Sequence, residues 1–446
     1  MKIKALSRPL SSYQTPGSNV SRQPRNLDPA LHPFERAREY TRALNATKLD
    51  RMFASPFICQ LGKGHVDGVY SIAGDPSSLS HIASGSGDGI VKVWNLETKE
   101  EIFSTKAHDN IVKDTVWTHD RKLLTCAADK SIKLFDPYSA RSKDPPKATY
   151  LGNTAYTSLT HHRSLPHFAA SSSGQISIHD LTRTSTAPLQ SLPSTYSDTI
   201  TSLRFNPVET SLLAAASTDR RLTLYDLRTS SALPPAVLAF ASNSISWNPM
   251  EAFNLAVASE DHNIYILDTR NLSRSLNILK DHVAAVMDVS FSPTGEELVS
   301  ASYDRTIRLW RRSEGHSRDI YHTKRMQRVF RATFTSDSKY VLSGSDDGNI
   351  RLWRAQANAR SGIKSFAHRQ KLEYDAALVE RYKHMPEIRR IIRHRHVPKA
   401  VKKSGEIKGE ELKAIKRRRE NERKHSRLKE RPRRAERDKV VLAVEE

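Results

Sequence analysis

Residues 84–95 read SGSGDGIVKVWN, which is a run of small residues, a tight turn and then a strand with alternating apolar side chains. The Asp-Gly pair at Asp88 is typical of a hairpin turn, and apolar residues at every second position indicate a strand with one buried face. Similar runs recur further along the chain as CAADKSIKLFD, SSSGQISIHD, AASTDRRLTLYD, ASEDHNIYILD, SASYDRTIRLW and SGSDDGNIRLW. The middle of the chain therefore consists of seven related β-units.

The spacing of these units is regular. One equivalent turn position, which recurs every 41 to 46 residues, is occupied in order by Asp88, Asp129, Ser173, Asp219, Asp261, Asp304 and Asp347. Six residues after each of them stands Trp94, Phe135, His179, Tyr225, Leu267, Trp310 or Trp353. A period near 40 residues predicts a repeat array rather than a set of independent domains.

The units resemble the WD-repeat family, whose members form β-propellers of four-stranded blades. The resemblance implies an all-β fold, a seven-bladed WD-repeat propeller over residues 57–356. It also implies that a His, a Ser, the turn Asp and the strand Trp form a hydrogen-bonded set within a blade. The residues matching that set here are His65, Ser84, Asp88, Trp94, His282, Ser300, Asp304, Trp310, Asp347 and Trp353. Units three and five depart from it at Ser173, His179 and Leu267, and we expect packing alone to hold those blades.

Residues 57–61 precede the first unit as an outer strand that has no inner strands of its own. We expect this strand to pair with unit seven and so close the ring, because closure protects the exposed edges of the sheets.

Charge divides the chain into a nearly neutral ring and two basic flanks. Of 71 Lys and Arg and 49 Asp and Glu, residues 57–356 hold 33 and 31, whereas residues 357–446 hold 28 and 14. Residues 1–56 hold 10 and 4, and the formal net charge of the chain is +22. Such an excess points to a polyanionic partner. The flanks are interpreted as an N-terminal arm (1–56), a basic helical extension (357–403) and a basic tail that is helical or disordered (404–446).

Both flanks show helical patterns. We expect a helix from about residue 35 to 49, within an arm that packs on the propeller, and another from 368 to 383, ended by Pro386. Beyond it, Ile388, Ile391 and Ile392 alternate with arginines, which suggests docking on protein by one side and on phosphate by the other. The predicted RNA-binding residues are Arg389, Arg390, Arg393, Arg395, Lys399, Lys402, Lys403, Arg417, Arg418 and Arg419. The runs KRRRENERK at 416 and RPRR at 431 also fit a nuclear import signal.

Blades six and seven carry further basic residues, which would extend an RNA-facing surface onto the ring. They include Arg308, Arg311, Arg312, Lys324, Arg325, Arg328 and Arg331.

The sequence offers no starting set for catalysis. It has no His-Glu-x-x-His, no Gly-x-Ser-x-Gly and no P-loop lysine motif, and the glycines at 85–89 lie between two strands. Cys59 and Cys126 lack the spacing of a metal or disulfide motif. No run of 18 apolar residues occurs. We therefore expect no enzyme activity, no metal, no cofactor, no small-molecule substrate and no membrane span.

A closer resemblance covers residues 24–403. The segments NLDPALHPFERAREYTRALNATKLDRMFA, FNPVET, SWNPMEAF, SPTGEELVSASYDRTIRLW, YHTKRMQRV, TSDSKYVLSGSDDGNIRLW and RRIIRHRHVPKAV together resemble the suppressor-of-fibrillarin WD-repeat family. The resemblance implies a nucleolar component of the small-subunit processome that associates with pre-ribosomal RNA, a box C/D small nucleolar ribonucleoprotein and other processome proteins to mature 18S ribosomal RNA.

Two alternatives stay open. The family also includes DDB- and cullin-associated factors, and some WD-repeat receptors of cullin-RING ubiquitin ligases contact the adaptor through a Trp-Asp-x-Arg box. Tyr225-Asp226-Leu227-Arg228 and Leu267-Asp268-Thr269-Arg270 resemble that box without its Trp, and ordinary turns at strand ends would explain them equally well. The second alternative is a generic chromatin or messenger-RNA scaffold.

Overall fold

The computed structural model describes residues 30–31, 33–138, 145–183, 186–192, 198–229, 231–359, 362, 364–425 and 435–444. The first part of the predicted N-terminal arm, through residue 29, and the RPRR run at 431–434 lie outside these residues. The described chain divides into two compact units, one that includes residues 54–359 and 395–444 and one that brings together residues up to 53 with residues 362–394.

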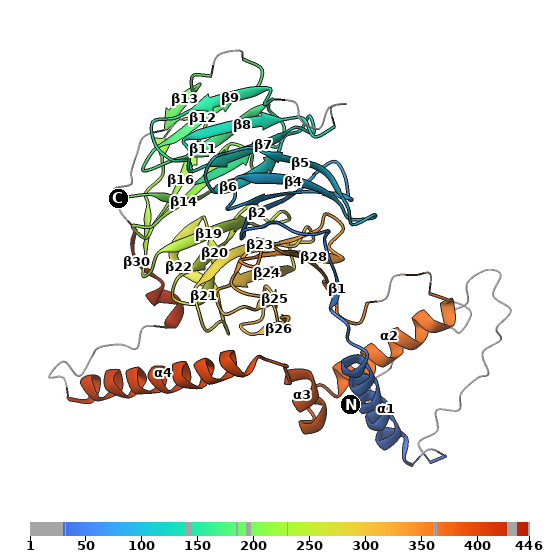
Figure 1. The fold of residues 1–446 in the computed structure, drawn as a ribbon. Coiled ribbons are helices and arrows are strands. Elements are labelled where there is room, and N and C mark those ends of the chain that lie inside the picture. The colour runs from blue at the N-terminus through green and yellow to red at the C-terminus, as the bar shows by residue number, and fades with distance from the viewer. Residues whose placement is uncertain are drawn as a thin grey trace. The chain divides into compact units, whose positions relative to one another are not determined.

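The larger unit is a β-propeller, with seven antiparallel sheets in its described residues (Figure 1). In the first three blades the strands run outward as β2 (Val69–Gly74), β3 (His81–Ser86), β4 (Ile90–Asn95), β5 (Glu101–Lys106); β6 (Val112–Trp117), β7 (Leu123–Ala127), β8 (Ser131–Phe135), β9 (Ala148–Leu151); β10 (Ser158–His161), β11 (His167–Ser171), β12 (Ile176–Asp180), β13 (Gln190–Leu192).

The other four blades repeat this arrangement. Their strands are β14 (Ile200–Phe205), β15 (Leu212–Ser217), β16 (Arg221–Asp226), β17 (Ser231–Ala232), β18 (Ala236–Leu238); β19 (Ser242–Trp247), β20 (Asn254–Ser259), β21 (Asn263–Asp268), β22 (Asn271–Lys280); β23 (Val286–Phe291), β24 (Glu297–Ser302), β25 (Ile307–Arg311), β26 (Ser317–Tyr321); β27 (Val329–Phe334), β28 (Tyr340–Ser345) and β29 (Ile350–Arg354). The seven-bladed fold class is therefore confirmed.

The predicted closure is confirmed as well. Strand β1 (Phe57–Gln60) pairs antiparallel with β29 as the outer strand of blade seven. The inner strand β27 of that blade lies beside β2 of blade one, so the ring of inner strands is continuous. The apolar core is divided among the blade interfaces; Val91 and Val93 of blade one, for example, pack with Val112 and Trp117 of blade two.

Neighbouring inner strands are joined by a repeated hydrogen bond that the sequence analysis did not foresee. A side chain near the start of one strand accepts the main-chain N–H of a residue in the next strand: Asp114 from Leu159, Ser158 from Leu203, Ser202 from Ile245 and Asp288 from Ala332. These side chains are buried. A buried acceptor that finds a donor on the next blade avoids a desolvation penalty, so each contact favours this blade packing.

Asp114 and Asp288 also bind arginines of other blades. Arg204 of β14 contacts Asp114 at 3.0 Å, while Arg331 of β27 lies 3.6 Å from Asp114 and 3.4 Å from Asp288. Burial alone would raise the pKa of the Asp114 carboxyl, but the two guanidinium groups outweigh it and the pKa is lowered. The two pairs at Asp114 link inner strands of blades that are not neighbours, whereas Arg331 and Asp288 lie on neighbouring blades.

The smaller unit contains three helices. They are α1 (Glu35–Met52), α2 (Phe366–Arg381) and α3 (Pro386–Arg393), which meet through buried Ala43, Leu378 and Ile388. Tyr40 and Tyr382 pack edge to face at 6.0 Å. The predicted helices at 35–49 and 368–383 are thus present with shifted ends, and the N-terminal helix packs with the C-terminal extension. Packing of the arm on the propeller stays a prediction.

The C-terminal region differs from the predicted division at residue 403. Helix α4 (Lys399–His425) runs through that point, and the short 3-10 helix η2 (Glu436–Lys439) and strand β30 (Val441–Val444) follow. Strand β30 pairs with β18 at the outer edge of blade four. Val440 and Val441 are buried in the core between blades four and five. Residues 440–444 are therefore part of the propeller.

Candidate nucleic-acid interface

Helix α4 contacts the propeller with one side, near the turns that precede blade six. Val401 is buried, a Cβ added at Gly405 would lie 3.8 Å from Val283, and the Lys408 ammonium donates to the His282 carbonyl at 2.8 Å. The spacing 401, 405, 408 places these residues on one face of a helix. Burial is the main reason why the pKa of Lys408 is lowered.

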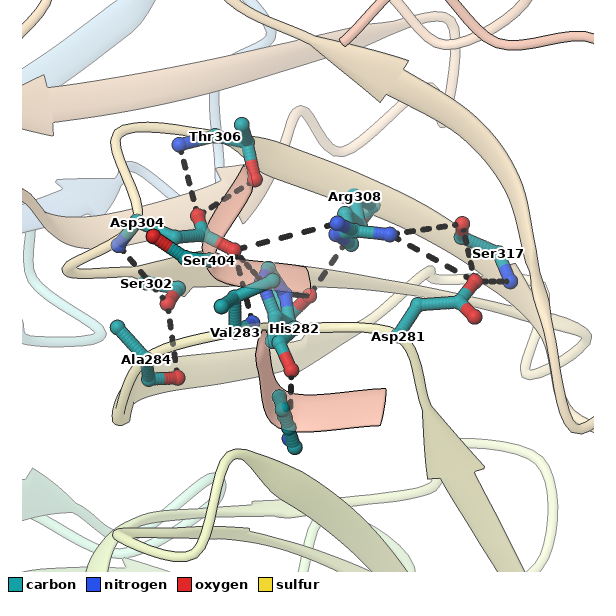
Figure 2. A network of polar contacts seen from close by, with 12 residues as sticks. Asp281, His282, Val283, Ala284, Ser302, Asp304, Thr306, Arg308, Ser317 and Ser404 are labelled. Carbon is teal, nitrogen blue, oxygen red and sulfur yellow. Dashed lines mark hydrogen bonds and ion pairs between the residues drawn. The ribbon is translucent and has the colours of Figure 1, made fainter. Parts of the chain in front are cut away.

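The surface that receives α4 is a buried polar network of blade six (Figure 2). His282 contacts Asp304 at 2.8 Å through Nδ1 and Ser300 at 2.6 Å through Nε2, and the Trp310 indole donates to the same Ser300 hydroxyl at 2.8 Å. Arg308 lies 3.6 Å from Asp281 and 4.0 Å from Asp304. Figure 2 shows Ser404 of α4 beside this network.

The ionisation of this network follows from its burial. Burial is the main cause that lowers the pKa of His282. For Asp304, burial would raise the pKa, but His282, Arg308 and the hydroxyl of Thr306 outweigh it and lower the pKa. The His282 imidazole is held between the Asp304 carboxylate and the Ser300 hydroxyl. These two contacts fix the position of the loop whose His282 carbonyl accepts the hydrogen bond from Lys408.

The other blades realise the predicted hydrogen-bonded set to different degrees. In blade one His65 contacts Ser84 at 2.8 Å and Trp94 donates to Ser84 at 2.8 Å. Asp88 instead accepts the N–H of Ile90, so the predicted four-residue set is incomplete there. In blade seven Trp353 donates to Ser343 at 2.8 Å, while Asp347 pairs with Arg351.

Blades three and five are not held by packing alone, contrary to the sequence-based expectation. In blade three His179 stacks on Phe168 at 5.0 Å, as expected of packing, but its Nε2 also contacts the Ser177 hydroxyl at 3.0 Å. In blade five Asp261 accepts hydrogen bonds from Asn263 and from the Tyr265 hydroxyl. Each blade thus replaces the missing set with a local polar contact.

Most of the ten predicted RNA-binding residues are exposed, and they fall in both units. Those in the three-helix unit are Arg389, Arg390 and Arg393, and those along α4 are Lys399, Lys402, Lys403, Arg417, Arg418 and Arg419. The exception is half-buried Arg395, whose guanidinium donates to the Ser317 carbonyl at 3.4 Å. We therefore reassign Arg395 to the attachment of the extension to blade six.

Three exposed cations of α4 face away from the attachment, whereas exposed Arg419 lies at the same angle around the helix as Val401. At 3.6 residues per turn, Lys399, Lys403 and Arg417 lie about half a turn from Val401 and Lys408. Their side chains are exposed. Glu406 and Glu410 share this outer region of the helix, but basic residues outnumber them. Helix α4 therefore exposes Lys and Arg side chains at helical spacing, while its other side is attached to blade six.

Only part of the predicted basic surface on blades six and seven is exposed. Arg308 is 4% exposed, and half-buried Arg331 lies 3.6 Å from Asp114. Arg311 and Arg312 form ion pairs with Glu314 and Glu251. Lys324, Arg325 and Arg328 are exposed, so an RNA-facing surface on these blades stays a prediction that rests mainly on these three residues.

The four candidate adaptor contacts form two equivalent turns on blades four and five. Arg228 and Arg270 each bind the carboxylate two residues earlier, with closest N–O distances of 3.2 Å to Asp226 and 2.9 Å to Asp268. Both arginine side chains are about two-thirds exposed, at 69% and 64%. The turns follow the third strand of their blades, whereas His282 precedes an inner strand. Because the strands are antiparallel, these turns and α4 lie at opposite faces of the ring.

Among the described residues, we find no group of three or more His, Cys, Asp or Glu side chains placed to hold a metal ion. Within the same residues, no helix is both long and apolar enough to cross a bilayer.

A closed ring of seven blades, each built on the strand-turn pattern described above, defines a WD-repeat propeller protein. A family model described as WD domain, G-beta repeat matches residues 57–95, 99–136, 186–226, 273–311 and 314–354. A second, described as Sof1-like domain, matches residues 355–441.

Similar proteins that match along the full length of the chain identify the family within the WD-repeat propeller proteins. Protein SOF1 of Saccharomyces cerevisiae is 49% identical, with 100% of this chain and 95% of that protein covered. Protein sof1 of Schizosaccharomyces pombe is 49% identical, and DDB1- and CUL4-associated factor 13 of Xenopus laevis is 44% identical, each covered over 100% of both chains. The chain belongs to the family of Sof1 and DDB1- and CUL4-associated factor 13.

Proposed function

We propose that this protein is a non-catalytic ribosome-biogenesis factor of the small-subunit processome. In this role it acts in the nucleolus, associates with pre-ribosomal RNA, a box C/D small nucleolar ribonucleoprotein and other processome proteins, and supports maturation of 18S ribosomal RNA. The observation that carries the proposal is the two-sided helix α4. One side is docked on blade six through Lys408, and the other exposes a row of Lys and Arg side chains.

The electrostatics support RNA as the ligand of that row. Lys and Arg bind phosphate oxygens of any sequence, and affinity grows with the number of phosphates neutralised. A docked helix loses less conformational entropy on binding than a free tail, because its backbone is already ordered. Membership of the Sof1 family supports pre-ribosomal RNA as the particular RNA.

The test is ultraviolet crosslinking in living cells. The variant carries Lys399→Glu, Lys402→Glu and Lys403→Glu, which leaves the basic run at 416–424 unchanged and so separates RNA contact from nuclear import. We expect crosslinks to the 18S precursor and to a box C/D RNA to fall at least about fivefold, because three attractions become repulsions.

The matched control reverses three exposed charges on the propeller, at Lys63, Lys106 and Arg274. It should crosslink like the wild type. Unchanged crosslinking of the α4 variant, with the protein still nucleolar, would remove α4 from the RNA interface.

A second candidate function is supported by the paired turns of blades four and five. Here the protein is a substrate receptor of a cullin-RING ubiquitin ligase, and Asp226, Arg228, Asp268 and Arg270 contact the adaptor. Several relatives, among them those of Xenopus laevis and Dictyostelium discoideum, carry names that associate them with DDB1 and CUL4. Since these turns and α4 occupy opposite faces, the two functions do not exclude each other.

The double variant Arg228→Ala, Arg270→Ala is expected to lose DDB1 in a pull-down from cells, because both exposed guanidinium groups are removed. Arg274→Ala, on the outer strand of blade five, serves as the control that retains binding. Undiminished DDB1 recovery with the double variant would count against the receptor assignment.

A further inference from the structure

A cavity of about 390 Å³ opens between blades three and four. Its apolar lining comes from Leu165, Ile178, Leu189, Phe205 and Leu227. The volume is at the small end of the range of about 300 to 1,000 Å³ found for ligand sites. It can therefore accept one or two side chains, but no folded element.

Comparison with blade five explains why the cavity is open. In blade four the N–H of Leu227 donates to the Ser211 carbonyl at 2.9 Å, and in blade five the N–H of Thr269 donates to the Phe253 carbonyl at 2.9 Å. Ser211 and Phe253 thus hold the same position in their blades. The Phe253 ring fills the space beneath Arg270, whose guanidinium lies 4.2 Å from the ring centroid. Ser211 is too small to do the same beneath Arg228.

Arg228 gives the rim of this cavity its charge. It is the one Lys, Arg, Asp or Glu among the lining residues in the described part of the chain. Two of its nitrogens bind Asp226, at 3.3 and 3.2 Å, and a guanidinium has five N–H groups. Because the side chain is 69% exposed, the remaining donors are open to a further acceptor.

Two histidines line the cavity, and His167 Nδ1 lies 3.8 Å from an Asp180 oxygen. His162 Nδ1 accepts the N–H groups of Ser164 at 3.2 Å and Leu165 at 3.0 Å. Burial lowers the pKa of His162. The cavity therefore combines apolar walls with a single cationic edge, which complements an apolar group next to an anion.

We propose that this cavity binds a short linear peptide segment of a partner protein, with one bulky apolar side chain inserted between blades three and four and a neighbouring Asp or Glu carboxylate on Arg228. The site is distinct from the RNA-binding row of α4, and it uses only one of the two candidate adaptor arginines. A peptide carries an apolar side chain and a carboxylate only a few ångströms apart. It can therefore contact the apolar lining of the cavity and the Arg228 guanidinium at the same time.

The test selects peptides from a phage-displayed random library on the immobilised full chain, and measures the affinity of a synthetic consensus peptide by fluorescence anisotropy. We expect a consensus with a large apolar residue beside an acidic one. Ser211→Phe fills the cavity with the residue that blade five uses there, and it is expected to weaken binding at least about tenfold. Arg228→Glu should weaken binding about fivefold or more, and replacing the peptide's acidic residue by Lys should partly restore it.

Two matched variants make the result decisive. Ser211→Ala keeps the cavity open and should bind like the wild type. Arg274→Glu reverses an exposed charge on the outer strand of blade five, outside the cavity lining, and should also bind normally. Thermal melting confirms that each variant is folded. Failure to enrich any peptide, or a consensus peptide that binds Ser211→Phe as tightly as the wild type, would overturn the proposal without affecting the RNA function.

Discussion

Deletion of residues 57–61 is expected to abolish the cooperative thermal unfolding transition of the propeller. Strand β1 supplies the fourth strand of blade seven, so its loss exposes the edge of β29. The flanking hydrogen bonds also disappear, from the N–H of Leu61 to the Ile350 carbonyl at 3.0 Å and from the N–H of Arg354 to the Pro56 carbonyl at 2.8 Å. Open sheet edges favour association with other chains, so the deletion variant should also aggregate.

The side chains of this strand explain why the loss is large. Leu61 is 0% exposed and packs with Trp94 of blade one, and Phe57 packs edge to face on Trp353 of blade seven at 5.4 Å. The strand thus ties the last blade to the first. Differential scanning calorimetry measures the effect. The single variant Leu61→Ala should cost about 2 to 5 kcal/mol, with the transition lowered but present. A deletion variant that melts like the wild type would refute closure by β1.

The affinity for single-stranded pre-ribosomal RNA is expected to fall by about 300- to 15,000-fold between 50 and 200 mM salt, if roughly 6 to 10 phosphates are neutralised and each contributes about 0.7 to the log-log slope. The exposed cations of α4 and of the three-helix unit supply enough charge for that number. The reason is entropic, since binding releases counterions condensed on the RNA and added salt makes that release less favourable. Fluorescence anisotropy over a salt series measures the slope.

Reversing Arg417, Arg418 and Arg419 to Glu should lower the magnitude of that log-log slope by about two, because each lost phosphate contact on a single strand contributes about 0.7. Only one of the three is engaged in a side-chain ion pair in the described chain, Arg418 with exposed Glu422 at 3.1 Å, so the fold should be unaffected. Circular dichroism checks that α4 persists. The triple variant at Lys63, Lys106 and Arg274 should keep the wild-type slope. A flat salt response of the wild-type protein would contradict electrostatic RNA binding altogether.

Features that depend on local pattern could be predicted from the amino-acid sequence. The repeat of 41 to 46 residues set the number of blades, and alternation within each unit set the strands. The outer strand at 57–61 could be assigned to blade seven because this strand has no inner strands of its own, and pairing it with the last unit closes the ring. The helix expected at 35–49 is observed at Glu35–Met52, since helical spacing and the start of the helix are both local signals. The exposure of most predicted basic residues also followed from composition alone.

Contacts between residues that are distant in the sequence became visible only in the folded protein. Lys408 contacts His282, Val444 pairs with Ala236, and Arg331 reaches Asp114. No periodicity connects such positions, because their contacts depend on how the blades are placed around the ring. The same holds for the cavity beside Arg228, whose counterpart Arg270 lies over the Phe253 ring. The two arginines stand in similar local sequences, but Ser211 and Phe253 fill the space next to them differently. A local pattern fixes the direction of a strand and the face it buries, whereas the volume between two blades is set by side chains that come from both.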